Sequence, residues 1–448
     1  MQHRKAGMAK LSPSQPVEPD RSAHSESTGA PDDRPPGRFA ALAYRNYRLF
    51  FFGQLISVTG TWMQSLAQSY LVYDVLDASP FQLGLVNVFQ FAPVLFLGIP
   101  AGVIADRFPK RPLLVFTQST FAILAAVLAL LVSFGHVQLW QVYLIAGLFG
   151  ITNALDMPTR QSFVPELIGK HALMNAIALN STMFNTGRVI GPAIAGMVLA
   201  AFGPVVCFAI NAISYGGVIT GLLLMKLAPI ARTQAGSAAT RLREGIDYVR
   251  STPAIYRTII LVGALGTFGM NFNVWVPMLA SDSFESGPGA YGLLFTAMGL
   301  GSLCGALTLA MFGRSPNRKR MLGAVIALGA VEVGIAVTAT IPTAVFAGAI
   351  GLAIAGFLSS TAMATANTSV QTVATSELRG RVMAVYMTVF AGSTPLGALL
   401  SGGIADRFGI PIAIGFGGFA TLIAAVAIAW VQRERLAPPL QHKVTGST

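Results

Sequence analysis

Twelve continuous runs of mostly apolar residues follow one another along this chain of 448 residues. Each run is close to the ~20 residues that a helix needs to cross the ~30 Å hydrocarbon core of a bilayer. Within that core only helices and closed barrels can satisfy every backbone polar group. The runs show no polar–apolar alternation, which favours helices over strands. We therefore predict an all-α membrane protein with twelve transmembrane helices, over residues 47–73, 81–105, 112–134, 139–158, 172–200, 204–226, 257–281, 289–313, 321–340, 343–370, 380–404 and 410–431.

The basic residues lie almost entirely on one of the two sides that these spans define. Charged residues make up only 11% of the chain, whereas about a quarter is usual in soluble domains. Of the 30 Lys and Arg residues, 28 fall in alternate connections or in the two tails, and the exceptions are Arg188 and Arg407. The positive-inside rule then predicts a multi-pass protein of the cell (inner) membrane with both termini in the cytoplasm. This placement explains the net charge of +12 without a nucleic-acid partner.

The polar segments divide the chain into five parts. Residues 1–43 are rich in Pro, Ser, Asp and Arg, which predicts a disordered cytoplasmic tail without a signal peptide. A six-helix bundle at 44–228, a linker at 229–256, a second six-helix bundle at 257–432 and a cytoplasmic tail at 433–448 follow. In the linker, 241-RLREGIDYVRS-251 has apolar residues at helical spacing among charges, which predicts an amphipathic helix at the membrane surface.

Two levels of repetition run through the spans. The two halves share short phrases at a shift of about 208 residues, as in Pro80-x-x-x-Gly84-Leu85 and Pro288-x-x-x-Gly292-Leu293. A finer repeat ends the second, fifth, eighth and eleventh spans with 102-GVIADRF-108, 196-GMVLAAF-202, 306-ALTLAMF-312 and 402-GGIADRF-408. The repeating unit is therefore three helices, used four times, and because three is odd, successive units enter the membrane inverted. Nested inverted repeats of this kind occur in one class of secondary transporters.

With these motifs the chain resembles transporters of the major facilitator superfamily over residues 44–435. The phrase 102-GVIADRFPKR-111 is similar to the superfamily signature after the second helix, and 187-GRVIGPAIAG-196 is similar to the signature of the drug-efflux antiporter branch. The resemblance is closest to the group of enterobactin exporters and macrolide efflux proteins, and it is carried by 45-RNYRLFFFGQLIS-57, 163-FVPELI-168, 176-AIALNS-181 and 377-ELRGRVM-383. It implies the major facilitator fold and proton-driven export.

The resemblance also implies a conformational latch formed by Gly102, Asp106, Arg107, Lys110 and Arg111. This charge cluster is expected to join the two halves on the cytoplasmic side in one state and to break in the other. The alternative is a solvated loop that only fixes topology. Two stretches depart from the family pattern: 309-LAMFGRSPNRKR-320 keeps the basic residues but has no Asp, and 147-GLFGITNALDMPTR-160 lacks the Arg motif of many proton antiporters. The second departure leaves the site of proton coupling open.

The small residues of the fifth span, Gly187, Gly191, Pro192 and Gly196, allow close contact with a neighbouring helix and a bend at the proline. The resemblance adds a role in sealing the protein against leakage, and simple packing is the alternative. Arg188 lies near mid-depth, where an ionisable side chain costs about 2.5–3.5 kcal/mol or more and is therefore expected to be functional. It is predicted either to bind an anionic substrate or to form a structural pair. Glu332, the one acid that these spans place well inside the membrane, is the candidate for proton coupling, although the third helix of each unit is usually scaffold in the superfamily.

Polar side chains at helical spacing predict a cavity between the halves. The candidate residues are Thr61, Trp62, Gln64 and Gln68 in the first span, Asn87 and Gln90 in the second, Arg188 in the fifth, Asn271, Asn273 and Trp275 in the seventh, and Asn367 and Gln371 in the tenth. Interhelical hydrogen bonds worth about 1 kcal/mol each are the alternative explanation for these amides. A cavity of this composition favours neutral, amphipathic or anionic cargo.

The sequence therefore predicts a proton-coupled exporter of an amphipathic small molecule, drug-like or siderophore-like, that works by alternating access as a monomer without a cofactor. A secondary importer of a small nutrient is the alternative function, which the fold permits equally. An enzyme or an ATP-driven pump is not predicted, because the chain has no G-x-x-x-x-G-K-[ST] phosphate-binding loop. Its five His residues and two cysteines, Cys207 and Cys304, show no metal-binding spacing.

Overall fold

The computed structural model describes residues 39–168, 172–227, 238–285, 287–312, 317–375 and 377–433. The two predicted tails lie almost wholly outside the described residues, as does the first part of the linker. Described residues are almost entirely helical, as predicted.

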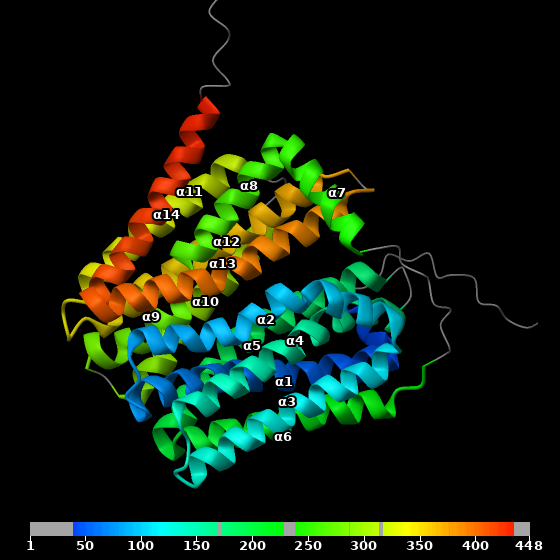
Figure 1. Cartoon of the computed structure of the whole chain (residues 1–448), viewed down its shortest axis with the longest axis horizontal. Coiled ribbons are helices and arrows are strands. Elements are labelled where there is room, and N and C mark those ends of the chain that lie inside the picture. Colours follow the sequence, from blue (N-terminus) through cyan, green and yellow to red (C-terminus); the bar gives the residue numbers. More distant parts are fainter. Residues whose placement is uncertain are drawn as a thin grey trace, which may run out of the picture.

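The N-terminal group of helices, drawn from blue to green in Figure 1, is built around α1. α1 contacts both α5 and α6, while α2 and α3 each pack against α4. The elements are η1 (Ala40–Ala43), α1 (Arg45–Tyr70), the π-helical turn η2 (Leu71–Val75), α2 (Pro80–Arg107), α3 (Lys110–Ser133), α4 (Leu139–Leu167), α5 (Leu173–Phe202) and α6 (Pro204–Leu224).

The C-terminal group follows the linker helix α7 and is drawn from green to red in Figure 1. Its elements are α7 (Ala238–Ser251), α8 (Pro253–Ala264), the π-helical turn η4 (Leu265–Gly269), α9 (Phe272–Met278), the π-helical turn η5 (Leu279–Ser283), α10 (Pro288–Phe312), α11 (Arg318–Thr338), α12 (Val345–Val373), α13 (Arg379–Phe408) and α14 (Ile410–Arg433). α7 covers the segment predicted to be amphipathic, and α12 packs against both α10 and α11.

The seventh predicted span, 257–281, is not one regular helix. It begins earlier, at Pro253, ends at Ser283, and is interrupted at Met270 and Asn271 between η4 and α9. The interruption follows Gly269, and the Asn271 side chain donates to the Thr267 carbonyl oxygen at 2.8 Å. Short π-helical insertions of this kind are frequent at functional sites.

Ten helical segments among the described residues are long and apolar enough to cross a membrane. α1 and α4 are of similar length but do not meet this criterion, because amide, hydroxyl and charged side chains lower their mean hydropathy. α4 also runs beyond the predicted end at 158, to Leu167, and contains Pro158 and Pro165. Proline is tolerated in membrane helices because neighbouring groups satisfy the freed backbone. The predicted number of twelve spans therefore stays a prediction.

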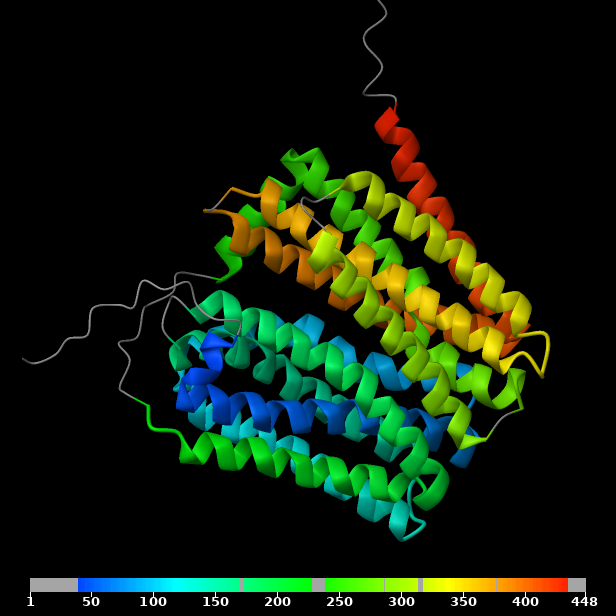
Figure 2. The same cartoon turned by 180° about the vertical axis from the view of Figure 1, so that it is seen from behind.

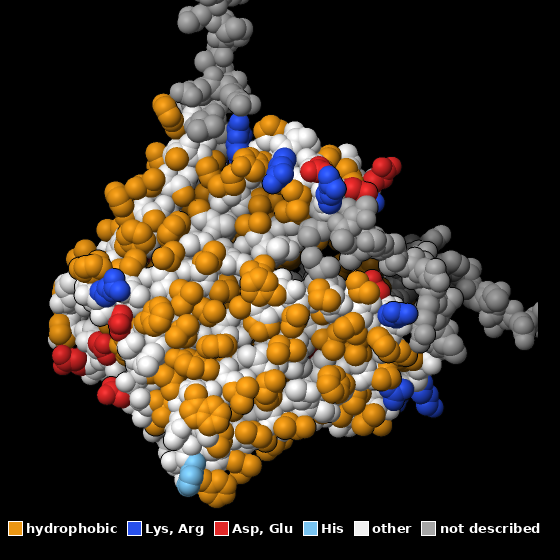
Figure 3. Space-filling model, viewed as in Figure 1, with side chains coloured by type: hydrophobic (Ala, Val, Ile, Leu, Met, Phe, Trp, Pro, Cys, Tyr) orange, Lys and Arg blue, Asp and Glu red, His pale blue; other side chains and the backbone are white. Residues whose placement is uncertain are grey.

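The surface combines an apolar belt with charged side chains gathered toward its two ends, mostly red at one and both blue and red at the other (Figure 3). Large apolar side chains such as Phe96, Ile213 and Met311 are exposed on the helices, as expected where lipid replaces water. We call the end that carries Lys110, Arg111, Arg320 and Arg381 the basic end, and the end that carries Asp74, Asp282 and Asp406 the acidic end. The two groups of ribbons diverge toward the basic end in both views (Figure 2).

Candidate transport pathway between the helix groups

The first contact between the groups, that of α2 with α13, is closest at the acidic end. A Cβ at Gly84 would lie 2.6 Å from the Ala398 carbonyl oxygen, and a Cβ at Gly402 would lie 2.6 Å from the Pro80 carbonyl oxygen. Nearer the middle, the three atoms nearest to a Cβ at Gly392 all belong to the Leu95 side chain, the first at 3.1 Å. At the basic end, a Cβ at Gly102 would have nothing within 4 Å. The two helices therefore touch backbone to backbone at one end and separate at the other.

The second contact, that of α5 with α10, also brings glycine against backbone. A Cβ at Gly196 would lie 2.6 Å from the Gly292 Cα atom, and the Pro192 carbonyl oxygen lies close by, 3.2 Å from a Cβ at Gly292. The other two small residues of the motif, Gly187 and Gly191, face α1 instead, against Val58 and Thr59. The motif thus packs α5 on both sides, once within its own group and once across the interface, and the predicted role in sealing stays a prediction.

Tyrosine–aspartate hydrogen bonds join the groups at the acidic end. The Tyr73 hydroxyl donates to Asp282, and the Tyr291 hydroxyl donates to Asp74. Ser281 also donates to Asp74, with Oγ 2.9 Å from Oδ1. The two aspartates lie in the π-helical turns η2 and η5, at the same place in the two halves by the shift of about 208 residues. We call these five residues the acidic-end closure.

The predicted latch at the basic end makes no bond across the interface in the described residues. Lys110 forms an ion pair with Glu166 at the end of α4, and Arg111 Nη2 donates to the Leu223 carbonyl oxygen at 2.7 Å. Both partners belong to the N-terminal group. Asp106 and Arg107 are exposed. In the described residues, side-chain bonds therefore join the two groups at the acidic end, whereas the latch residues do not join them at the basic end.

Some of the predicted cavity residues are buried between helices, and the others keep exposed surface. Thr61 and Gln64 contact α6: the Thr61 and Tyr215 hydroxyl oxygens lie 3.1 Å apart, and Asn211 Nδ2 donates to Gln64 Oε1 at 2.6 Å. Trp275 is buried and its Nε1 donates to Ser401 on α13. Gln64, Gln68, Asn87, Asn271 and Trp275 are buried, and Thr61, Trp62, Gln90, Arg188, Asn273, Asn367 and Gln371 retain exposed surface. Gln371 Nε2 donates to Asn367 Oδ1 at 2.8 Å, on the same helix.

Two arginines of the N-terminal group each lie over an aromatic ring. The Arg188 guanidinium is 5.8 Å from the centre of the Trp62 ring, and the Arg160 guanidinium is 5.5 Å from the centre of the Phe184 ring. Arg188 lies beside the interface, because a Cβ at Gly299 of α10 would be 2.8 Å from its carbonyl oxygen. Its Nε atom has no hydrogen-bond partner in the described residues. A guanidinium with a free donor suits an anionic or aromatic ligand.

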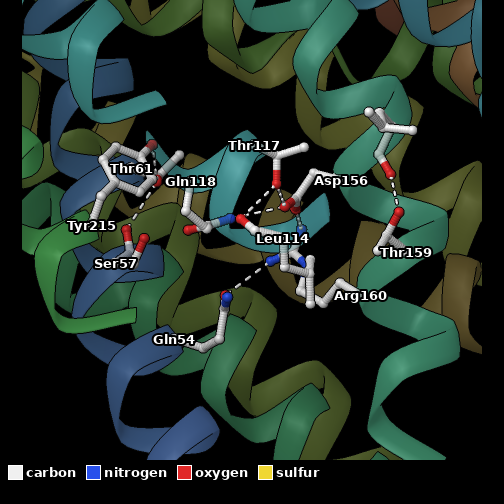
Figure 4. Close-up of polar contacts among 11 residues, drawn as sticks. Gln54, Ser57, Thr61, Leu114, Thr117, Gln118, Asp156, Thr159, Arg160 and Tyr215 are labelled. Atoms are coloured by element: carbon white, nitrogen blue, oxygen red, sulfur yellow. Dashed lines mark hydrogen bonds and ion pairs between the residues drawn. The ribbon is translucent and has the colours of Figure 1, made fainter. Parts of the chain in front are cut away.

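Asp156 on α4 is a buried acid that the sequence interpretation missed (Figure 4). Its residue surface is 1% exposed. Asp156 Oδ1 accepts from Thr117 Oγ1 at 2.7 Å and from Gln118 Nε2 at 2.8 Å, both on α3. Asp156 Oδ2 lies 3.1 Å from Arg160 Nη2, and Arg160 Nη1 donates to Gln54 Oε1 on α1 at 3.1 Å. We call these five residues the α4 network.

The predicted span that ends at 158 hides this network, because it assigns Arg160 to a cytoplasmic connection. The available signal is the spacing of Asp156 and Arg160, since opposite charges four residues apart pair on one helix face. Glu332 is buried as well, in α11 against Gly418 of α14, and neither carboxyl oxygen has a hydrogen-bond partner in the described residues. Glu332 is thus not the only buried acid.

The sequence of the chain matches known transporters over most of its length. The model of one branch of the major facilitator superfamily, described as the transmembrane secretion effector family, matches residues 36–438. The chain is a member of this family. Other members of the superfamily are similar to it at low identity: a staphyloferrin A transporter of Staphylococcus aureus is 27% identical, over 86% of this chain and 96% of the relative.

Two further relatives carry names of exporters. The multidrug efflux pump Tap of Mycolicibacterium fortuitum is 28% identical over 81% of this chain and 90% of its own length. The enterobactin exporter EntS of Escherichia coli is 26% identical over 90% of this chain and 95% of its own length. These names and the family assignment confirm the predicted superfamily and the predicted resemblance to siderophore and drug exporters.

Solved transporter structures share the fold of this secretion effector. A POT family transporter in complex with 5-aminolevulinic acid aligns with a TM-score of 0.72 at 13% identity, over 86% of this chain and 96% of that chain. A bacterial homologue of the human lysosomal transporter Spinster, in an inward-facing and occupied conformation, aligns with a TM-score of 0.68 at 14% identity. The alignment covers 87% of this chain and 97% of that chain. At such identities the likeness concerns the fold alone.

Proposed function

We propose that this protein is a secondary active exporter that moves an amphipathic small molecule out of the cell by alternating access, driven by protons. In this proposal twelve helices span the cell (inner) membrane as a monomer, in two halves at 44–228 and 257–432 built from four inverted three-helix repeats. The basic end and both termini face the cytoplasm, in keeping with the positive-inside rule. The two tails and the linker at 229–256 would then be cytoplasmic.

The observation that carries the proposal is the one-sided interface. Contacts between the groups concentrate in glycine–backbone approaches and in the acidic-end closure, while Gly102 at the basic end meets nothing. A carrier in this state would take up cargo from the cytoplasm. Opening of the acidic end and closing of the basic end would release it outside, and the latch of Gly102, Asp106, Arg107, Lys110 and Arg111 would then join the halves.

The cargo that we propose is an anionic or neutral molecule with an aromatic or apolar part. The pairs Arg188–Trp62 and Arg160–Phe184 offer a guanidinium beside a ring, a combination that binds such groups. Two of the relatives are a staphyloferrin A transporter and an enterobactin exporter, and a third is a multidrug efflux pump. We therefore place siderophore-like and drug-like compounds first. Among the predicted cavity residues, those with exposed surface are the first candidates to contact the cargo.

The proposal is tested in a bacterium deprived of its own efflux pumps. Cells that express the protein are loaded with a macrolide, a neutral aromatic dye or a catecholate siderophore, and accumulation is measured with and without a protonophore. Asp106→Asn serves as the inactive control. Lowered accumulation that both the protonophore and Asp106→Asn abolish is the expected result. Raised uptake would favour the importer, and exclusion that persists with protonophore would contradict proton coupling.

A further inference from the structure

We propose that Asp156 binds the coupling proton and that the α4 network is built to hold this residue in both its charged and its neutral form. The inference rests on the proposed function, since it names the residue through which proton-driven export would act. Glu332 is the candidate from the sequence, and Asp156 is distinguished from it by its partners.

The charged form of Asp156 is satisfied in the structure. Its two oxygens receive three contacts, from Thr117, Gln118 and Arg160. A buried carboxylate persists when it is paired and hydrogen-bonded in this way. Arg160 keeps 17% of its side-chain surface exposed, so the network is not completely enclosed by protein.

The Thr117 hydroxyl can serve the neutral form as well. Thr117 Oγ1 lies 2.7 Å from Asp156 Oδ1 and 3.1 Å from the Leu114 carbonyl oxygen, both of which are acceptors. A hydroxyl has one proton to donate and two lone pairs to accept with. When Asp156 is charged, Thr117 donates to it. When a proton is added to Oδ1, the new O–H of Asp156 donates to Thr117 Oγ1, and the hydroxyl proton of Thr117 turns to Leu114.

Two other buried atoms of the α4 network have no hydrogen-bond partner in the described residues. Gln118 Oε1 is buried without a hydrogen-bond partner, although the Nε2 atom of the same amide bonds Asp156. Rotation of this amide by half a turn would present an acceptor to the single O–H of a protonated Asp156, as an alternative to Thr117. Gln54 Nε2, next to Arg160, is also buried without a partner. An unpartnered buried polar atom normally costs about 1–3 kcal/mol of stability. A site that alternates between two bonding patterns explains why such atoms are present here.

Loss of the negative charge on Asp156 would act directly on the helices of the interface. Arg160 would lose its ion pair, and the helices that it contacts are α1, through Gln54, and α5, through Phe184. α5 carries Gly196, which touches the C-terminal group. The ionisable groups facing Asp156 are Arg160 on its own helix and Tyr215 on α6, and the contacts from α3 are neutral. Glu332 lacks such partners, so its protonation would change no bond in the described residues.

The first test measures proton binding without any cargo. Full-length protein is reconstituted in lipid vesicles, and infrared difference spectra between acidic and neutral pH record the carboxyl stretch of an acid that gains a proton. We expect one component of this band to vanish in Asp156→Asn, to persist in the matched variant Glu332→Gln, and to reappear at a shifted pH in Asp156→Glu. Persistence of the whole band in Asp156→Asn, or its loss in Glu332→Gln alone, overturns the assignment.

The second test measures transport of a neutral aromatic dye, a macrolide and a catecholate siderophore in the pump-deficient cells. In Asp156→Asn we expect loss of export against a gradient with retention of downhill exchange, whereas Glu332→Gln exports like the wild type. Uphill export by Asp156→Asn overturns the inference even if the exporter assignment holds. If the wild type moves none of the three, the proposed function fails, and the infrared result still decides which residue binds the proton. Monodisperse behaviour of each variant in detergent, and the carboxyl band of Asp156→Glu, separate these outcomes from misfolding.

Discussion

Removal of the Tyr291 hydroxyl should shift the protein from the state closed at the acidic end toward the opposite state. The hydroxyl donates to Asp74 across the interface, while the ring, 1% exposed, packs edge-on against Tyr70. Tyr291→Phe keeps the ring and deletes only the bond. The bond exists only while the acidic end is closed, so its loss acts on one of the two states.

The size of the shift follows from the environment of the bond. A hydrogen bond to a charged group contributes about 1.5–3 kcal/mol. Asp74 is exposed and keeps its bond from Ser281, so the lower value, about 1.5 kcal/mol, applies to Tyr291→Phe. This corresponds to a change of about tenfold in the ratio of the two states. Adding Tyr73→Phe removes the second bond, and about 3 kcal/mol corresponds to a change of about a hundredfold.

The assay follows a cysteine placed where the acidic end opens. Ala398, 2% exposed and in contact with Gly84, is replaced by Cys in a Cys304→Ser background, and its reaction rate with a membrane-impermeant thiol reagent is measured. The rate should rise by the factors given above. Tyr47→Phe is the matched control, because Tyr47 is as buried as Tyr291 but its hydroxyl donates to the Ala176 carbonyl oxygen within one group. A rate that changes less than about twofold in Tyr291→Phe would refute the role of the acidic-end closure in setting this equilibrium. A rate that rises in Tyr47→Phe by as much as in Tyr291→Phe would refute it as well.

Three more predictions concern the interface, the latch and the cargo. Gly196→Val should lower the free energy of unfolding by about 1–3 kcal/mol, because it forces side-chain atoms against Gly292. Thermal unfolding in detergent measures this loss. The control Gly216→Val, at a position with open space, should change the stability little. Asp106→Asn should abolish export while leaving the melting temperature of this state unchanged, because the side chain is exposed and makes no bond across the interface in the described residues; a large loss of stability would contradict the latch. Arg188→Lys should raise KM more than it lowers the maximal rate, and Arg188→Ala should raise KM further; equal affinity for all three proteins would exclude Arg188 from the cargo site.

The helical class and the membrane character follow from the length of the apolar runs, and the family resemblance follows from a few motifs around Asp106 and Gly191. The partners of the polar residues do not follow in the same way. Gln64 is an amide in an apolar helix whichever neighbour it meets, and its bond to Asn211 depends on the packing of α1 against α6. Local pattern carries no information on which helix lies beside which.

Two residues of the α4 network show a second limit: Asp156 was overlooked near the end of its predicted span, and Arg160 was placed outside that span. Pro158 lies between Asp156 and Arg160, and a proline among charged residues normally indicates the end of a span. In the structure α4 continues for nine residues beyond it. Tertiary contacts from α1, α3 and α5 surround the charges and make the longer helix possible. The break at Asn271 was hidden for a different reason, since the segment around it has no charged residue and lies within one long, mostly apolar run.

The glycine contacts of α2 with α13 and of α5 with α10 bear on how such a carrier diversifies. Surfaces made of backbone and glycine have no rotamers to rearrange, so one helix can roll over the other without unlocking interleaved side chains. The barrier to motion would then depend on a few polar bonds at either end and hardly on the residues between them. Mutations in those intervening residues can alter which molecule is carried while the rate of the conformational change stays the same. One fold can then acquire new cargo by a series of single substitutions.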